Sequence, residues 1–201
     1  MSEDAGSVTN ATGTMTGGGL GRALGEVPRS ARWILPAAAA AFAGTETSAI
    51  GQRERALLIL RVASIERSPY WRTQIEGVAG DLGLTEDEIT LVESDEWETA
   101  PAFDDRERAA ILWGDRVARR LARRDRVAYE TVRAVFDEDA FVELTMIAAL
   151  AAMHARIANA LRIVPEPPTG LAPRARPISD DVFRTWNASM FDDHAHEEIA
   201  S

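Results

Sequence analysis

The sequence predicts an all-α protein, and three observations support this class. Apolar residues recur three and four positions apart in several segments, which places them on one face of a helix. Polar capping residues precede these segments, and glycine or proline follows them, as at helix ends. No segment shows the alternation of apolar and polar residues that is typical of a strand.

The expected helices follow one another from residue 32 to residue 163. The first covers residues 32–42 and is short. The second covers residues 52–64 and is apolar almost all the way round, which is typical of a central helix. Arg61 lies inside it and therefore needs a partner. The later helices are expected at residues 69–82, 85–93, 104–117, 128–136 and 138–163.

The later helices carry recognisable start and stop signals. Ser68 is placed to cap the third helix, and Pro69 suits its first position. Thr85 begins a capping box for the fourth helix. Asp137 precedes the longest helix, and Pro165 ends it.

Two similar segments predict an internal repeat. The stretch RERALLIL at residues 53–60 recurs as RERAAILW at residues 106–113. Each is followed by the rest of a helix, a turn and a further helix. We therefore expect a duplicated helical unit, although two copies are the minimum on which a repeat can be argued.

The chain divides into three parts. Residues 1–20 are polar and rich in glycine and are expected to be disordered. Residues 21–164 form the helical domain. Residues 165–201 are expected to form a proline-rich linker and a C-terminal helix, whose apolar face would dock on its own domain or on a neighbouring subunit. That face consists of Phe183, Trp186 and Met190.

Composition argues against several classes of function. The net charge of −10 disfavours nucleic-acid binding, which needs a basic surface. The absence of cysteine rules out thiolate nucleophiles, disulfides and iron–sulfur clusters. No apolar run approaches the ~20 residues of a membrane span, and the acidic start is unlike a secretory signal. We expect a cytoplasmic protein without a membrane partner.

The order of four segments resembles the carboxymuconolactone decarboxylase family, which includes the alkyl-hydroperoxidase D-type proteins. The resemblance covers roughly residues 30–164, and the segments that carry it read RERALLILRVAS, SPYWRTQIEGVAGDLGLTEDEI, FDDRERAAIL and FDEDAFVELTMIAALAAMHARIANALRI. The resemblance implies an alkyl-hydroperoxidase D-like helical bundle that contains the duplicated helical unit. It also implies a homo-oligomer, a trimer or hexamer, with a dimer as an alternative.

The resemblance does not extend to the peroxidase residues of that family. Its peroxidase members carry a C-x-x-C-x-x-x-H motif at the start of a helix and a glutamate one helix earlier. The matching positions of this sequence hold Ser68, Trp71 and Ile75, with Ala56 in place of the glutamate. Thiol peroxidase activity is not expected, because a helix end alone does not acidify a serine hydroxyl enough to replace a thiolate.

Two residues of the longest helix are candidate catalytic groups. His154 is the only histidine in the sequence of the helical domain, residues 21–164. The ordinary pKa of histidine suits proton transfer near neutral pH. Glu143 lies on the same face, but roughly 16 Å away along the axis, too far for a direct hydrogen bond. The alternative for His154 is a core histidine bonded to a carbonyl or an interface histidine. The alternative for Glu143 is a buried partner of an arginine such as Arg61.

Five further residues are candidates for substrate binding. If Arg61 pairs with Glu143, the pair could anchor a substrate carboxylate as well as the fold. Ser68, Tyr70 and Gln74 could supply neutral hydrogen bonds at a pocket mouth, with Trp71 as part of the wall. The alternative for the three polar residues is helix capping and surface exposure.

Two charged stretches carry less weight. A basic stripe on one helix face is more typical of a solvated or subunit-pairing surface than of an anion site; it consists of Arg116, Arg119, Arg120 and Arg123. His194 and His196 stand among carboxylates near the C-terminus. No metal site is expected there, because such terminal clusters are usually solvated.

Two functions remain. The first is a cofactor-independent, non-redox enzyme of the decarboxylase, isomerase or cyclase type that acts on a small carboxylated or carbonyl-bearing molecule. Donors at the turn from Ser68 to Tyr70 would stabilise an enolate, and His154 would move a proton. The second is a non-catalytic member that binds a ligand or a partner protein.

Overall fold

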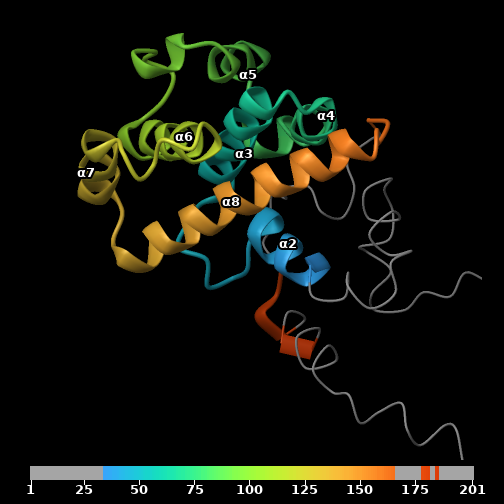
Figure 1. Cartoon of the computed structure of the whole chain (residues 1–201). Helices are drawn as coiled ribbons and strands as arrows, with labels where there is room; N and C mark the ends of the chain where they lie inside the picture. The colour runs from blue at the N-terminus through green and yellow to red at the C-terminus, as the bar shows by residue number, and fades with distance from the viewer. Residues whose placement is uncertain (1–33, 166–177, 182–183, 186–201) are drawn as a thin grey trace, which may run out of the picture.

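The computed structural model describes residues 34–165, 178–181 and 184–185 (Figure 1). Within these residues the chain is helical and contains no strand, so the all-α prediction is confirmed. The elements are α2 (Ile34–Ala43), α3 (Gln52–Glu66), α4 (Pro69–Glu76), η1 (Gly80–Leu82), α5 (Glu86–Glu93), η2 (Glu96–Glu98), α6 (Asp105–Ala118), α7 (Arg126–Val135) and α8 (Glu138–Ala160).

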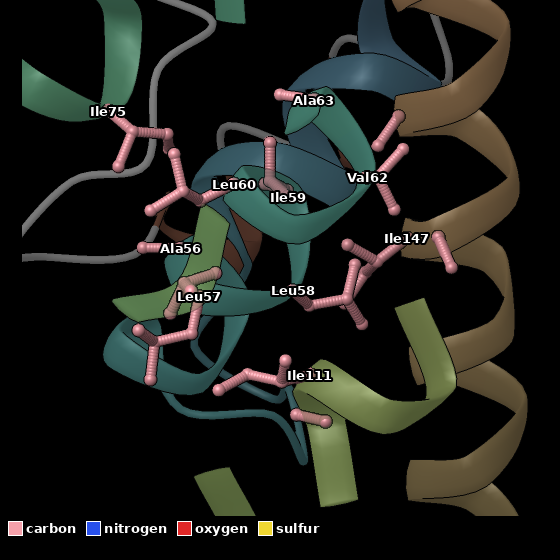
Figure 2. Close-up of a cluster of buried hydrophobic side chains, with 14 of the residues drawn as sticks. Ala56, Leu57, Leu58, Ile59, Leu60, Val62, Ala63, Ile75, Ile111 and Ile147 are labelled. Atoms are coloured by element: carbon pink, nitrogen blue, oxygen red, sulfur yellow. The ribbon is translucent and has the colours of Figure 1, made fainter. Parts of the chain in front are cut away.

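Helix α3 lies at the centre of the bundle, as its all-round apolar sequence predicts. It packs against α4, α5, α6 and α8, and nine consecutive residues of it, from Arg55 to Ala63, are buried. Figure 2 shows Leu58 and Val62 of α3 directed toward Ile147 of α8. The long helix α8 runs across the bundle and also contacts α2, α4, α6 and α7 (Figure 1).

The helix starts follow the capping signals of the sequence. The side chain of Thr85 accepts a hydrogen bond from the backbone of Glu88, and Asp104 and Asp137 cap α6 and α8 in the same way. Ser68 occupies the cap position of α4, but its side chain makes no capping hydrogen bond. The predicted position of the cap is therefore confirmed, but the predicted hydrogen bond from the helix backbone to the Ser68 side chain is absent.

The helix expected at residues 69–82 is interrupted. Helix α4 ends at Glu76, and a separate 3₁₀ turn follows at Gly80–Leu82. Gly77 at the end of α4 and Gly80 lower the helix propensity of this stretch. Gly83 ends the turn in a left-handed conformation, with a φ of 66°, so glycine does stop the second piece as predicted.

The repeated RER segments face each other and exchange ion pairs. Arg53 of the first copy binds Glu107 of the second, with an N–O distance of 2.5 Å. Arg106 of the second copy binds Glu54 of the first at 2.7 Å. The first arginine of each copy thus pairs with the glutamate of the other, so these contacts between α3 and α6 are reciprocal.

The third position of each copy has a matching role. Arg55 donates a hydrogen bond to the carbonyl oxygen of Ile50, five residues earlier. Arg108 donates to the carbonyl oxygen of Phe103, also five residues earlier. Each arginine therefore ties the loop before its helix to the helix, and the predicted duplicated unit is present in the fold.

Gly114 lets the two repeated helices approach closely. A Cβ atom on Gly114 would lie 3.1 Å from the backbone oxygen of Leu58 and 3.2 Å from its Cγ. Replacement by valine is expected to force α3 and α6 apart and to lower the free energy of unfolding by about 1–3 kcal/mol. Gly80→Val is the control, because no atom lies within 4 Å of its Cβ position. Equal effects in urea denaturation would contradict the close approach.

Helix α8 is long and apolar enough to be compared with a membrane span. By length and composition alone it could cross a membrane, although no uninterrupted apolar run in the sequence is of that size. The difference arises because single polar residues such as Glu143 and His154 interrupt the run without lowering its average hydropathy much. In the fold, α8 is a core helix of the bundle, and such helices pass the same test.

The chain returns to the α2–α3 loop near its C-terminus. Ile178 donates its backbone N–H to Gly44 at 2.8 Å and accepts one from Glu46 at 3.2 Å. The side chain of Thr47 also donates to Asp180 at 3.3 Å. Residues 1–20 and the expected docking face, Phe183, Trp186 and Met190, lie outside the described residues.

Candidate functional site

His154 is completely buried between aromatic side chains. Its ring centroid lies 5.1 Å from that of Phe42 on α2 and 6.4 Å from that of Trp71 on α4. Neither ring nitrogen has a hydrogen-bond partner in the part of the chain that the structure describes. One interpretation of the sequence expected a backbone carbonyl to accept a hydrogen bond from His154. Among the described residues no carbonyl does so.

Burial lowers the pKa of His154 to about 4, because the charged imidazolium loses its hydration. The ring is therefore neutral at neutral pH and is not poised between its two protonation states. It also lines neither of the two cavities described below. This geometry favours a packed core histidine over a group that moves a proton.

The start of α4 is closed by packing. Ser68, Tyr70, Trp71 and Gln74 are each at most 3% exposed, so none of them stands at the mouth of a pocket as the sequence suggested. Trp71 packs edge-to-face against Phe42 at 4.5 Å and against Tyr70 at 5.5 Å between ring centroids. Aromatic contacts of this kind stabilise a core.

The positions that match the peroxidase motif are part of the same core. Ala56, Trp71 and Ile75 have no exposed surface, and Ser68 is 3% exposed. A residue that lies in close-packed core cannot meet a substrate without movement of its neighbours. The structure thus places apolar packing where the resembling peroxidases carry their reactive groups.

Arg61 has the partner that its buried position requires, but the partner is not Glu143. Its guanidinium binds Asp115 of α6 at 2.7 Å and Asp95 at 2.8 Å. It also donates to the carbonyl oxygens of Val92 and Ser94 at the end of α5. All these contacts hold α5 and α6 to α3. They engage the Arg61 guanidinium within the protein, which argues against a role as a substrate anchor.

Glu143 pairs with Arg55 instead. The Arg55 Nη2–Glu143 Oε1 distance is 2.6 Å, and the other carboxylate oxygen accepts the backbone N–H of Ala49 at 2.8 Å. Arg55 and Arg61 lie six residues apart on α3, which turns their side chains by about 240° around the helix axis. The sequence correctly predicted that Glu143 pairs with an arginine. The suggested arginine, Arg61, was wrong, because the partner is Arg55.

Glu143 also lines a cavity of about 370 Å³, which we call the α2–α8 cavity. Its side chain is 25% exposed, whereas that of Arg55 behind it has no exposed surface. The walls are mainly apolar, with hydroxyl groups gathered at the α2–α3 loop. The other lining residues are Ala37, Ala40, Ala41, Thr45, Thr47, Ser48, Met146, Ile147 and Leu150.

The charge at the polar end of this cavity is balanced. The Glu143 carboxylate faces the cavity, and the Arg55 guanidinium neutralises it from the protein side. The hydroxyls of Thr45 and Thr47 lie 3.2 Å apart, and the Ser48 hydroxyl accepts the backbone N–H of Thr45 at 3.0 Å. Such an end offers hydrogen bonds next to a paired carboxylate.

Of the seven site residues expected from the sequence, the structure therefore brings Glu143 alone to this cavity. His154 lies in the core with Ser68, Tyr70, Trp71 and Gln74, and Arg61 belongs to a separate ion network. Sequence reasoning missed Arg55 and the hydroxyl residues of the loop. The repeated RER motif could have indicated Arg55, because its third position recurs in both copies.

Comparison with known proteins supports the fold. No protein-family model and no curated protein matches the chain. A crystal structure does match: a protein of unknown function from Agrobacterium tumefaciens, proposed to be the antioxidant defence protein AhpD. The two share 23% sequence identity with a TM-score of 0.61, over 69% of this chain and 92% of that one. The chain therefore has an all-α, alkyl-hydroperoxidase D-like fold.

Proposed function

We propose that this chain binds a small, largely apolar organic molecule in the α2–α8 cavity and carries out no thiol redox chemistry. The observation that carries the proposal is the cavity itself. Its volume of about 370 Å³ lies within the range of small-molecule sites, and its walls combine apolar side chains with a few polar groups. The residues at the start of α4 are packed and offer no comparable space.

The polar end favours a neutral group on the ligand. The Glu143 carboxylate is paired with Arg55, so the cavity lining offers no unpaired cation to a ligand carboxylate. The Ser48 hydroxyl, which accepts the backbone N–H of Thr45, keeps its own proton and can donate it to a carbonyl oxygen. Of the two ligand classes expected from the sequence, the carbonyl-bearing one therefore fits this cavity better than the carboxylated one.

A cofactor-independent enzyme is the second candidate, and the position of Glu143 favours it. A carboxylate at a cavity wall can accept a proton from the carbon next to a ligand carbonyl and return it to another carbon. The Ser48 hydroxyl would then donate to the enolate oxygen and stabilise it. This reaction would be an isomerisation, with no net transfer of electrons and with no part for His154.

The binding proposal is tested by thermal shift with cyclohexanone, δ-valerolactone and cyclohexanecarboxylate. We expect the ketone and the lactone to raise the melting temperature more than the acid does. Ala40→Phe should abolish this shift, because the new side chain would fill the cavity from α2. Ala134→Phe, at an exposed position of α7, should preserve it. A shift that survives Ala40→Phe, or no shift with either neutral ligand, would contradict the proposal.

The same panel separates the two candidates. Product formation from a stabilising ligand that is lost in Glu143→Gln would support the enzyme. Stabilisation without any product would support binding alone.

We also propose that the chain forms a homo-oligomer, without a nucleic-acid or membrane partner. Val142 and Met146, one turn apart on α8, are 57% and 55% exposed. Adjacent exposed apolar side chains of this size often mark an association surface. A cytoplasmic location remains the expectation from the sequence.

A further inference from the structure

Helix α7 packs against α6 and α8 at one side of the bundle (Figure 1). A second cavity is lined by residues of α6, α7 and the start of α8 and of the loop between α6 and α7. We call it the aromatic groove. Its volume is about 680 Å³, and it shares no residue with the α2–α8 cavity. The lining residues are Trp113, Ala122, Arg123, Arg126, Tyr129, Glu130, Phe141 and Thr145.

Three aromatic rings from three helices form one cluster in this groove. The Phe141 ring centroid lies 4.8 Å from that of Trp113 and 5.4 Å from that of Tyr129. Trp113 donates its indole N–H to the hydroxyl of Thr145 at 2.9 Å, which fixes the indole ring. Tyr129 remains 45% exposed. Trp113 is buried and Phe141 is half-buried, with the Arg133 guanidinium 5.3 Å from its ring centroid, so the groove presents mainly the Tyr129 ring to solvent.

The charged residues of the groove are mainly basic. Arg126 forms an exposed pair with Glu130 at 2.7 Å, so these two charges largely cancel. Arg123 is exposed and forms no ion pair within the described residues. The groove thus carries the positive charge of Arg123 in a chain whose net charge is −10, and the Arg133 guanidinium lies next to the groove, 5.3 Å from the Phe141 ring centroid.

We propose that the aromatic groove binds a flat aromatic carboxylate. The ring of the ligand would pack on Tyr129 and Phe141, since offset and edge-to-face ring contacts are favourable. Its carboxylate would form an ion pair with the guanidinium of Arg123, which can donate two parallel hydrogen bonds to it. This site has the opposite preference from the α2–α8 cavity, and it does not rest on the function proposed there.

The proposal departs from the expectation that the basic stripe is a solvated or subunit-pairing face. Arg116 and Arg119 of that stripe are engaged by Asp115. Arg123, in contrast, has no carboxylate partner in the described part of the chain and lines a groove with an aromatic floor. Aromatic and cationic groups side by side distinguish a ligand site from a uniformly solvated stripe.

The test is saturation-transfer-difference NMR on the full chain, with benzoate as the probe at low ionic strength. Benzyl alcohol lacks the charge, and cyclohexanecarboxylate lacks the aromatic ring. We expect saturable binding of benzoate that is stronger than the binding of either analogue. Arg123→Gln should weaken benzoate binding about tenfold, as expected for the loss of a charge-assisted hydrogen bond. Added salt should also weaken it.

Arg72→Gln is the matched control. Arg72 is half exposed and pairs with Glu76 on α4, and no residue of α4 lines the groove. It should leave the affinity for benzoate unchanged. The proposal is overturned if benzoate shows no saturable binding, if Arg123→Gln binds like the wild type, or if Arg72→Gln weakens binding equally. If a contact between subunits covered the groove, benzoate would show no saturable binding, and the proposal would be overturned.

Discussion

Replacement of Asp115 by alanine is expected to lower the free energy of unfolding by about 3–5 kcal/mol. Asp115 is 1% exposed and binds Arg61, which is 2% exposed. Without the carboxylate, the Arg61 charge would stay in the core with only one exposed carboxylate and several carbonyl oxygens around it. Urea denaturation followed by circular dichroism measures the loss.

Asp95→Ala is the control, because Asp95 binds the same guanidinium but is 86% exposed. Its removal should cost at most about 1 kcal/mol, as for other exposed ion pairs. Equal losses in the two variants would show that the buried pair does not hold α3 and α6 together.

The contribution of Asp115 also depends on pH. Burial tends to raise the pKa of Asp115, but hydrogen bonds from Arg119 and Arg61 outweigh this and place the pKa below its ordinary value of 3.8. A carboxyl group with a lowered pKa in the folded state stabilises the fold above its unfolded pKa. This stabilisation is therefore expected to persist at neutral pH and to be lost as the pH falls below about 3.8.

His154→Leu is expected to resist acid better than the wild type. The folded pKa of His154 is about 4, and the unfolded value is 6.5, so the unfolded chain takes up a proton first as the pH falls. The wild type should therefore lose stability between pH 6.5 and pH 4. At pH 4.5 the loss from this residue should be about 2–3 kcal/mol, and leucine removes it.

The measurement is the free energy of unfolding at pH 7 and at pH 4.5 for both proteins. All other titrating groups are shared, so their contributions cancel in the comparison. Parallel pH profiles for His154→Leu and the wild type would mean that the imidazole titrates normally and is accessible to water.

Local signals in the sequence predicted most of the fold. Capping residues such as Thr85, Asp104 and Asp137 act on the chain next to them, so their effect can be read without knowledge of the tertiary structure. The continuous apolar character of α3 likewise indicated its central place. The repeat predicted that α3 and α6 are equivalent, and their exchanged ion pairs confirm this.

The candidate site was harder to predict because it depends on contacts between distant segments. Arg55 and Arg61 lie on one apolar helix, and the sequence does not show which of them faces Glu143. The polar character of Ser68 and Gln74 suggested solvent, yet the packing of α4 turns both side chains inward. A cavity between α2 and α8 depends on how far these helices stand apart, which no local pattern encodes.

NMR titration of the His154 imidazole tests most directly whether the start of α4 is closed core. The chain also contains His194 and His196, and the signal missing from His154→Leu assigns the buried ring. A pKa of about 4 is predicted, as burial between Phe42 and Trp71 requires. A pKa at or above 6 would instead place the imidazole in contact with water and would contradict a closed, non-reactive core.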